Sequence, residues 1–195
     1  MMAGGACIVI FVLVHPQGEF TPAVMAGTQA QVAHTFHFVG ATLAAFGLAG
    51  LLAHQVERHD RLALVGVIVA FFGAVWFSGL GVLSFAGLPF IAKHDPALLL
   101  ATGAFWNDAP NPVFLLGLVS FVLGFVVLGV ALLRGKGLPR WSGLLLILGS
   151  VLSAPPPVAV PSVLILTAGG VLLGAGLAWV GYGMWSESKV AGAHP

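Results

Sequence analysis

The sequence predicts an all-α fold, a polytopic transmembrane helical bundle of about six helices in one domain that covers residues 1–195. Hydrophobic residues make up 59% of the chain, charged residues only 7%, and the mean hydropathy is +1.07. Because so few charges cannot keep a surface of this size in water, the chain belongs in a lipid bilayer. The apolar segments lack period-two alternation, and a segment in lipid must satisfy its own backbone hydrogen bonds, which favours helices over barrel strands.

Six apolar segments are separated by polar or proline-containing connections. They span residues 2–14, 31–53, 63–92, 112–133, 140–155 and 161–185. The first segment is short, because about 13 residues rising 1.5 Å each cover only about 20 Å of a hydrocarbon core of roughly 30 Å. Residues 6–14 also resemble the core of a signal peptide, although no Lys or Arg precedes them. Removal of residues 1–26 as such a peptide would leave five helices.

The basic residues predict how the bundle is oriented. Six of the seven Lys and Arg residues fall after the second, fourth or sixth segment: Arg58, Arg61, Arg134, Lys136, Arg140 and Lys189. By the positive-inside rule these regions face the cytoplasm, so both termini are cytoplasmic and residues 186–195 form a flexible cytoplasmic tail. On the outer side, Asp95 followed by Pro96 predicts a short interfacial helix within the loop of residues 93–112.

Small residues recur four positions apart in several segments. Examples are Gly40 with Ala44, Gly66 with Ala70, and Gly170 with Gly174. This spacing places small residues on one helix face, where it lets the backbones of neighbouring transmembrane helices approach closely. The glycines therefore predict tight helix packing within one bundle.

Histidines mark the outer ends of three segments. His34 and His37 lie about 300° apart around a helix and therefore share a face. His15 ends the first segment and His94 follows the third, so the three segments bring imidazoles to the same level of the membrane. We expect a histidine-bearing pocket there, with His34, His37, His15 and His94 as candidate cofactor-binding residues.

Three interpretations of these histidines remain open at this stage. They could bond loop carbonyls and lipid headgroups, bind haem b or a transition metal ion, or exchange protons or contact a quinone. A haem would need one of His34 and His37 to pair with His15 or His94, because two residues on one helix face cannot reach both faces of the ring. The candidate metal ligands are His34, His37, Glu19 and Asp95.

The sequence predicts no catalytic residues. Motifs for nucleophilic serine, zinc-protease, P-loop or dinucleotide chemistry do not occur, and a net charge of +1 without a basic run excludes nucleic-acid binding. The leading hypothesis is an accessory or assembly subunit of a larger membrane complex, with the lipid bilayer and other membrane subunits or a second copy as partners. The alternatives are a haem- or metal-binding redox protein and a small-molecule or proton transporter. Asp, Glu, Lys and Arg are absent from segments two to six away from their ends, which weighs against ion-coupled transport.

Three stretches carry a resemblance to a known group of sequences. They are HTFHFVGATLAAFGLAGLLAHQ (34–55), GLPRWSGLLLILGSVL (137–152) and GGVLLGAGLAWVGYGMW (169–185). They resemble small polytopic membrane proteins of unknown function from actinobacteria and related bacteria, in which an L-P-R-W-x-G stretch enters a late helix. The resemblance implies a helical bundle in a bacterial inner membrane and transfers no catalytic residues.

The predicted orientation can be tested with reporter fusions. A reporter that is active only outside the cytoplasm should give a signal when fused after Asn107 and none when fused after Gly135, because the basic connection is expected to stay inside. A signal from the Gly135 fusion alone would reverse the orientation.

Overall fold

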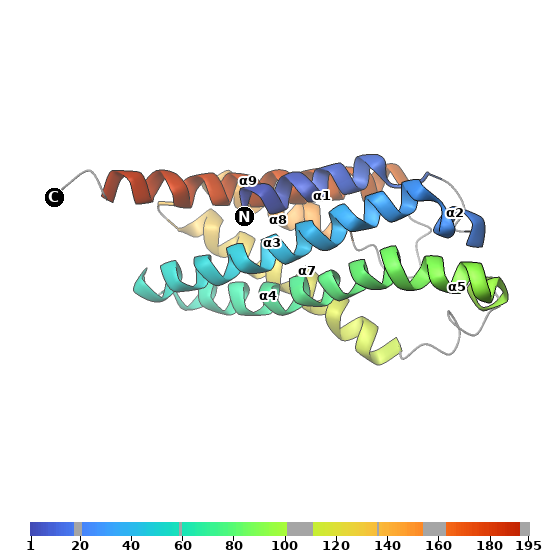
Figure 1. Ribbon diagram of the computed structural model, residues 1–195. Coiled ribbons are helices and arrows are strands. Elements are labelled where there is room, and N and C mark those ends of the chain that lie inside the picture. Colours follow the sequence, from blue (N-terminus) through green and yellow to red (C-terminus); the bar gives the residue numbers. More distant parts are fainter. Residues whose placement is uncertain (18–20, 59, 101–110, 136, 154–162, 192–195) are drawn as a thin grey trace.

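The computed structural model describes residues 1–195 apart from 18–20, 59, 101–110, 136, 154–162 and 192–195 (Figure 1). Its α-helices are α1 (Met2–Val14), α2 (Pro22–Ala26), α3 (Thr28–Arg58), α4 (Arg61–Val82), α5 (Leu88–His94), α7 (Asn111–Arg134), α8 (Arg140–Ser153) and α9 (Val163–Ala191). A π-helical segment, Leu83–Gly87, joins α4 to α5, and a 3-10 turn, Pro96–Leu99, follows α5. The all-helical fold is confirmed, since the described residues contain no strand.

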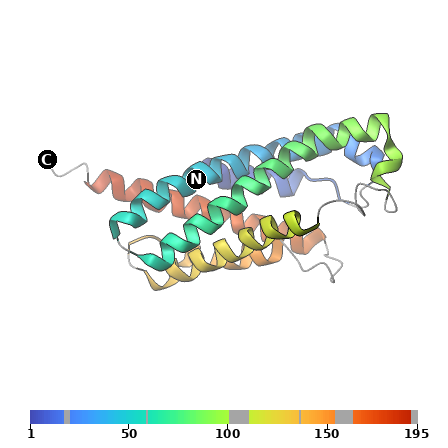
Figure 2. The same ribbon diagram turned by 90° about the horizontal axis from the view of Figure 1, so that it is seen from below.

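Six of these helices form a closed ring. The short helix α1 packs against both α3 and α9, and the ring continues from α3 through α4, α7 and α8 back to α9. The ring helices run along one long axis, with α2 and α5 packed together at one end (Figures 1 and 2). The six predicted segments correspond in order to α1, α3, α4 with α5, α7, α8 and α9.

Four helical stretches are long and apolar enough to cross a membrane: Thr28–Gln55, Arg61–His94, Phe114–Arg134 and Val163–Lys189. The helices α1 and α8 are apolar but shorter, as the lengths of their segments predicted. The chain is therefore an integral membrane helical bundle in which four long helices are supplemented by two short ones. The segment that resembles a signal peptide forms α1 and completes the ring.

A proline explains the π-helical segment between α4 and α5. Pro89 stands second in α5, and a proline inside a helix lacks an amide proton and clashes with the carbonyl group four residues earlier. The turn before it is widened, so that the Leu88 amide bonds to the Leu83 carbonyl five residues back. The helix thereby continues past the proline as one span to His94.

The helix ends fall into two groups. The α3–α4 turn, the α7–α8 turn and the C-terminal end of α9 lie at one end of the bundle, opposite α2 and α5 (Figures 1 and 2). This arrangement places Arg61, Arg134, Arg140 and Lys189 at the same end, which we call the basic end. At that end His54 Nε2 donates a hydrogen bond to Glu187 Oε2 over 2.8 Å and joins α3 to α9.

Two predicted boundaries differ from the structure. The expected flexible tail of residues 186–195 is helical as far as Ala191, because α9 continues well past the apolar segment, and residues 192–195 lie outside the description. Within the loop of residues 93–112, Asp95 precedes a single 3-10 turn without a side-chain cap. The rest of the expected interfacial helix falls on residues 101–110, which are also outside the description.

Two adjacent glycines allow α1 to pack closely against both α3 and α9. A methyl group on Gly4 would lie 2.8 Å from the backbone nitrogen of Ala44 in α3, and one on Gly5 would overlap the carbonyl oxygen of Gly174 in α9. Neighbouring helical residues point about 100° apart, so the two glycines face two different helices. Such backbone contacts supply van der Waals packing where lipid provides no hydrophobic driving force.

The same kind of contact joins other neighbours in the ring. A side chain at Gly66 would meet the backbone of Leu128 in α7. A methyl group on Gly129 in α7 or on Gly143 in α8 would overlap the carbonyl oxygen of the other glycine. The tight packing predicted from the small-residue spacing is therefore confirmed.

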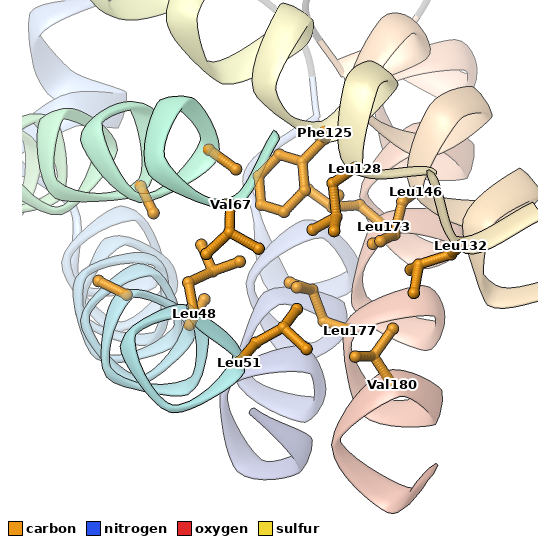
Figure 3. Packing of buried hydrophobic residues seen from close by; sticks show 14 of the residues in the cluster. Leu48, Leu51, Val67, Phe125, Leu128, Leu132, Leu146, Leu173, Leu177 and Val180 are labelled. Carbon is orange, nitrogen blue, oxygen red and sulfur yellow. The ribbon is translucent and has the colours of Figure 1, made fainter. Parts of the chain in front are cut away.

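Buried apolar side chains fill the half of the ring nearer the basic end. Figure 3 shows them pointing toward one another from α3, α4, α7, α8 and α9. The labelled residues are Leu48, Leu51, Val67, Phe125, Leu128, Leu132, Leu146, Leu173, Leu177 and Val180. These side chains form a close-packed apolar core across the ring.

The packing of α1 predicts a difference between two glycine substitutions. Gly5→Ala should lower the free energy of unfolding in detergent by about 1–3 kcal/mol, because the new methyl group pushes α1 away from the α9 backbone. Gly79→Ala should leave stability unchanged or raise it by up to about 1 kcal/mol, because its methyl group meets no described atom within 4 Å and alanine favours helices. Equal stabilities would contradict the contact between α1 and α9.

Candidate functional site

A cavity of about 280 Å³ lies inside the ring, and all six ring helices contribute to its wall. The polar lining residues are His15, Gln17, His37, Ser153 and Thr167, and the rest of the described wall is aliphatic, aromatic, glycine or proline. On α9 the wall extends from Val163 to Leu177, roughly 20 Å along the axis at about 1.5 Å per residue. The cavity is therefore elongated and runs from the middle of the bundle to the end opposite the basic end.

Three of the four candidate histidines lie together around one phenylalanine. The ring centroids of His15 and His34 are 5.0 Å apart, and those of His34 and His37 are 6.0 Å apart. Phe11 of α1 contacts all three rings, at 5.3 Å from His15, 5.5 Å from His34 and 4.6 Å from His37. The helices α1 and α3 thus bring these imidazoles to one level, beside the cavity.

The remaining candidates do not join them. His94 ends α5, where its ring packs on Phe90 of the same helix at 4.4 Å. Glu19 lies outside the described residues. In the described part of the chain no group of three or more His, Cys, Asp or Glu side chains is arranged to hold a metal ion, so the predicted set with Asp95 is not assembled there.

The contact between His15 and His34 does not fit a haem held between these two residues. Axial ligands must stand on opposite faces of the macrocycle. The imidazoles of His15 and His34 are in direct edge contact, which leaves no room for a porphyrin between them. His34 and His37 share a face of α3, as the sequence indicated.

His15 is held by the chain that follows it. Its Nδ1 donates a hydrogen bond to the Pro16 carbonyl over 3.0 Å, which fixes the orientation of the ring at the end of α1. Burial lowers the pKa of His15, because the desolvation of the imidazolium outweighs the hydrogen bond to Pro16, which raises it. His15 therefore lines the cavity with a fixed ring orientation, and its burial disfavours the charged form.

A continuous row of aromatic rings lines one side of the cavity. His37 stacks on Phe11 with an interplanar angle of 14° and meets Phe77 edge-on at 5.9 Å. Phe77 packs on Phe121 at 4.2 Å, and Phe121 packs on Phe125 at 5.1 Å. All five rings line the cavity, and they come from α1, α3, α4 and α7.

Two polar atoms of cavity-lining residues lack partners. The Nδ1 atom of His37 and the Oγ atom of Ser153 are buried and have no hydrogen-bond partner among the described residues, and neither does Nδ1 of the neighbouring His34. A buried polar atom without a partner costs roughly 1–3 kcal/mol, so such atoms mark places where a ligand or water completes the structure.

A second cavity lies at the basic end. It measures about 340 Å³, and its polar lining residues are Gln55 at the end of α3 and Asp60 before α4. On the helices that line both cavities, α3, α4 and α7, core residues fall between the two: on α3, Leu48 and Leu51 separate Ala44 from Gln55. A dry layer therefore divides the interior of the ring into two compartments.

Comparison with known proteins assigns the chain to no family. No protein-family model, no curated protein and no solved structure matches the chain. In the structure, the L-P-R-W-x-G stretch packs against two helices. Its Pro139 lies close to Gly183 of α9, and its Gly143 lies close to Gly129 of α7.

Most of the residues that line the cavity could not be predicted from the sequence. The histidines stood out as rare polar residues at segment ends, whereas Phe77, Phe121 and Phe125 are ordinary apolar residues within long apolar segments. Ser153 precedes the proline run and had no distinguishing signal. Only the ring closure shows that these side chains face the same space.

The position of Phe11 predicts a stability cost. Phe11→Ala should lower the free energy of unfolding by at least about 1 kcal/mol, less than the roughly 3–5 kcal/mol of a fully buried phenylalanine because part of the ring faces the cavity. Phe46→Ala is the matched control, since Phe46 is 71% exposed on the outside of α3 and should cost much less. Equal losses in the two variants would mean that the histidine rings do not pack on Phe11.

Proposed function

We propose that this protein binds a small, largely apolar molecule in the cavity inside its helix ring. The observation that carries the proposal is a cavity lined by all six ring helices whose wall is apolar except for a few polar groups. Small-molecule sites in proteins combine these features, and they occur between the helices of bundles. The unpaired atoms of His37 and Ser153 support the proposal, because a ligand with polar atoms would satisfy them.

The size of the cavity limits the ligand. Ligand pockets typically measure about 300–1,000 Å³, and this cavity of about 280 Å³ lies just below that range. A compact molecule with one or two rings fits such a volume. The described lining residues carry no Lys, Arg, Asp or Glu, which favours an uncharged ligand.

Transport of such a molecule is a second candidate function. The second cavity at the basic end favours it, because two compartments separated by an apolar layer would form a path across the bundle if the layer opened. Flux of a bound molecule across proteoliposomes would separate transport from binding alone.

The other predicted roles keep their status as hypotheses. An accessory subunit would use the lipid-facing surface of the ring and has no need of an internal cavity, so the cavity favours ligand binding. The bacterial inner membrane with the basic end in the cytoplasm is the location we propose for the protein, on the basis of the positive-inside rule and the sequence resemblance. A visible absorption spectrum and elemental analysis of purified protein would test for haem or metal, and we expect neither.

Filling the cavity should abolish ligand binding. Ala41 is buried and lines the cavity, whereas Ala49 is exposed on the same helix. With 2,3-dimethylnaphthalene as the probe, we expect the melting temperature of the wild type and of Ala49→Leu to rise with probe concentration, because a ligand that binds only the folded state stabilises it. Ala41→Leu should show no rise, because its added methyl groups occupy the site.

The control separates cavity binding from a general effect of the probe on the detergent. A rise of equal size in Ala41→Leu and Ala49→Leu would mean that the probe acts elsewhere, and the proposed function would then be wrong. Native mass spectrometry of the same three proteins gives an independent count of bound probe molecules.

A further inference from the structure

We propose that the ligand of the cavity is a planar conjugated ring with two oxygen acceptors, the chemistry of a quinone headgroup. This inference rests on the proposed function and adds the chemical class of the ligand. It follows from the shape of the aromatic wall and from the kind of polar atom that is left unpaired.

The aromatic wall favours a flat ligand. Phe11, His37, Phe77, Phe121 and Phe125 form an unbroken row of ring contacts along one side of the cavity. Rings prefer to meet other rings in offset-stacked or edge-to-face geometry, which a conjugated plane can adopt. A saturated acyl chain would gain only dispersion contacts from the same wall.

The opposite side of the cavity is made chiefly by α9. Gly170 lines it and has no side chain, and Val12 of α1 stands where its methyl group would be. Leu166 and Leu173 flank this glycine along the cavity. An aromatic row on one side and aliphatic groups on the other would hold the two faces of a flat ring.

The polar groups on the wall favour oxygen acceptors. The imidazole of His37 and the hydroxyl of Ser153 can both donate a hydrogen bond, and among the described cavity-lining residues their Nδ1 and Oγ atoms are buried without a partner. They belong to different helices, α3 and α8, and Thr167 of α9 adds a second hydroxyl beside the same space. A ligand with two carbonyl oxygens would accept from His37 and from a hydroxyl group without bringing charge into the membrane.

The experiment compares a quinone with its hydrocarbon. The probes are 2,3-dimethyl-1,4-naphthoquinone and 2,3-dimethylnaphthalene, which share shape and methyl groups and differ in the two carbonyl oxygens. Because both ring positions next to the carbonyls carry methyl groups, the quinone cannot add to the thiol of Cys7. Dissociation constants are measured on the detergent-purified full chain for the wild type, His37→Phe, His37→Gln and Ser153→Ala.

We expect the wild type to bind the quinone at least ten-fold more tightly than the hydrocarbon. His37→Phe should lose most of this preference while it keeps its affinity for the hydrocarbon, which shows that the cavity is intact. His37→Gln retains a donor and should recover part of the preference, and Ser153→Ala should lower it to a smaller degree. The infrared carbonyl band of the bound quinone should shift to lower frequency in the wild type and return toward its value in hydrocarbon solvent in His37→Phe.

The outcomes distinguish the two proposals. Equal affinities for quinone and hydrocarbon in the wild type, with binding still lost in Ala41→Leu, would overturn the ligand class and leave the proposed function standing. Failure of both probes to bind the wild type would overturn the ligand class together with the proposed function. If His37→Phe does not fold, a lowered preference in Ser153→Ala supports the ligand class and an unchanged preference there overturns it.

Discussion

The contact of the α1 backbone with α3 and α9 is the interaction on which the rest of the structure depends. Gly4 and Gly5 let the short helix reach the backbones of both neighbours at once. Without this wedge the ring of helices would have a gap, and lipid would enter the space that now forms the cavity. Phe11 belongs to the same helix and His15 follows its last residue. The packing of α1 that closes the ring therefore also places these two side chains at the cavity.

Several hydroxyl groups inside the bundle form hydrogen bonds within or between helices. Thr42 of α3 and Ser78 of α4 share a hydrogen bond of 2.7 Å, and the buried hydroxyl of Ser150 bonds the Ile147 carbonyl one turn back on its own helix. Membrane proteins pair polar groups in this way because lipid offers no alternative partner. Of the five buried side-chain atoms that lack a hydrogen-bond partner among the described residues, two belong to residues that line the cavity, His37 and Ser153.

The apolar core separates the cavity from the basic end of the bundle. Leucine and valine side chains from five helices meet inside the ring (Figure 3), and on α3 Leu48 and Leu51 lie between the cavity and Gln55. A ligand bound beside the aromatic row is thereby separated from the polar groups around Gln55 and Asp60. This arrangement favours binding of a ligand over its transport, because transport across the bundle would require the core side chains to separate.

The sequence alone determined the fold class, the order of the six ring helices and the clustering of basic residues at one end. These features depend on composition and local pattern, since an apolar segment in lipid must be helical wherever its neighbours lie. It also indicated that His34 and His37 share a face, which the geometry of a single helix dictates. Only the tertiary structure decided that α1 closes the ring and that His15 joins these residues while His94 does not. The reason is physical: a side chain's partners depend on how helices pack, and one apolar residue in an apolar segment looks like another until the helix faces are fixed.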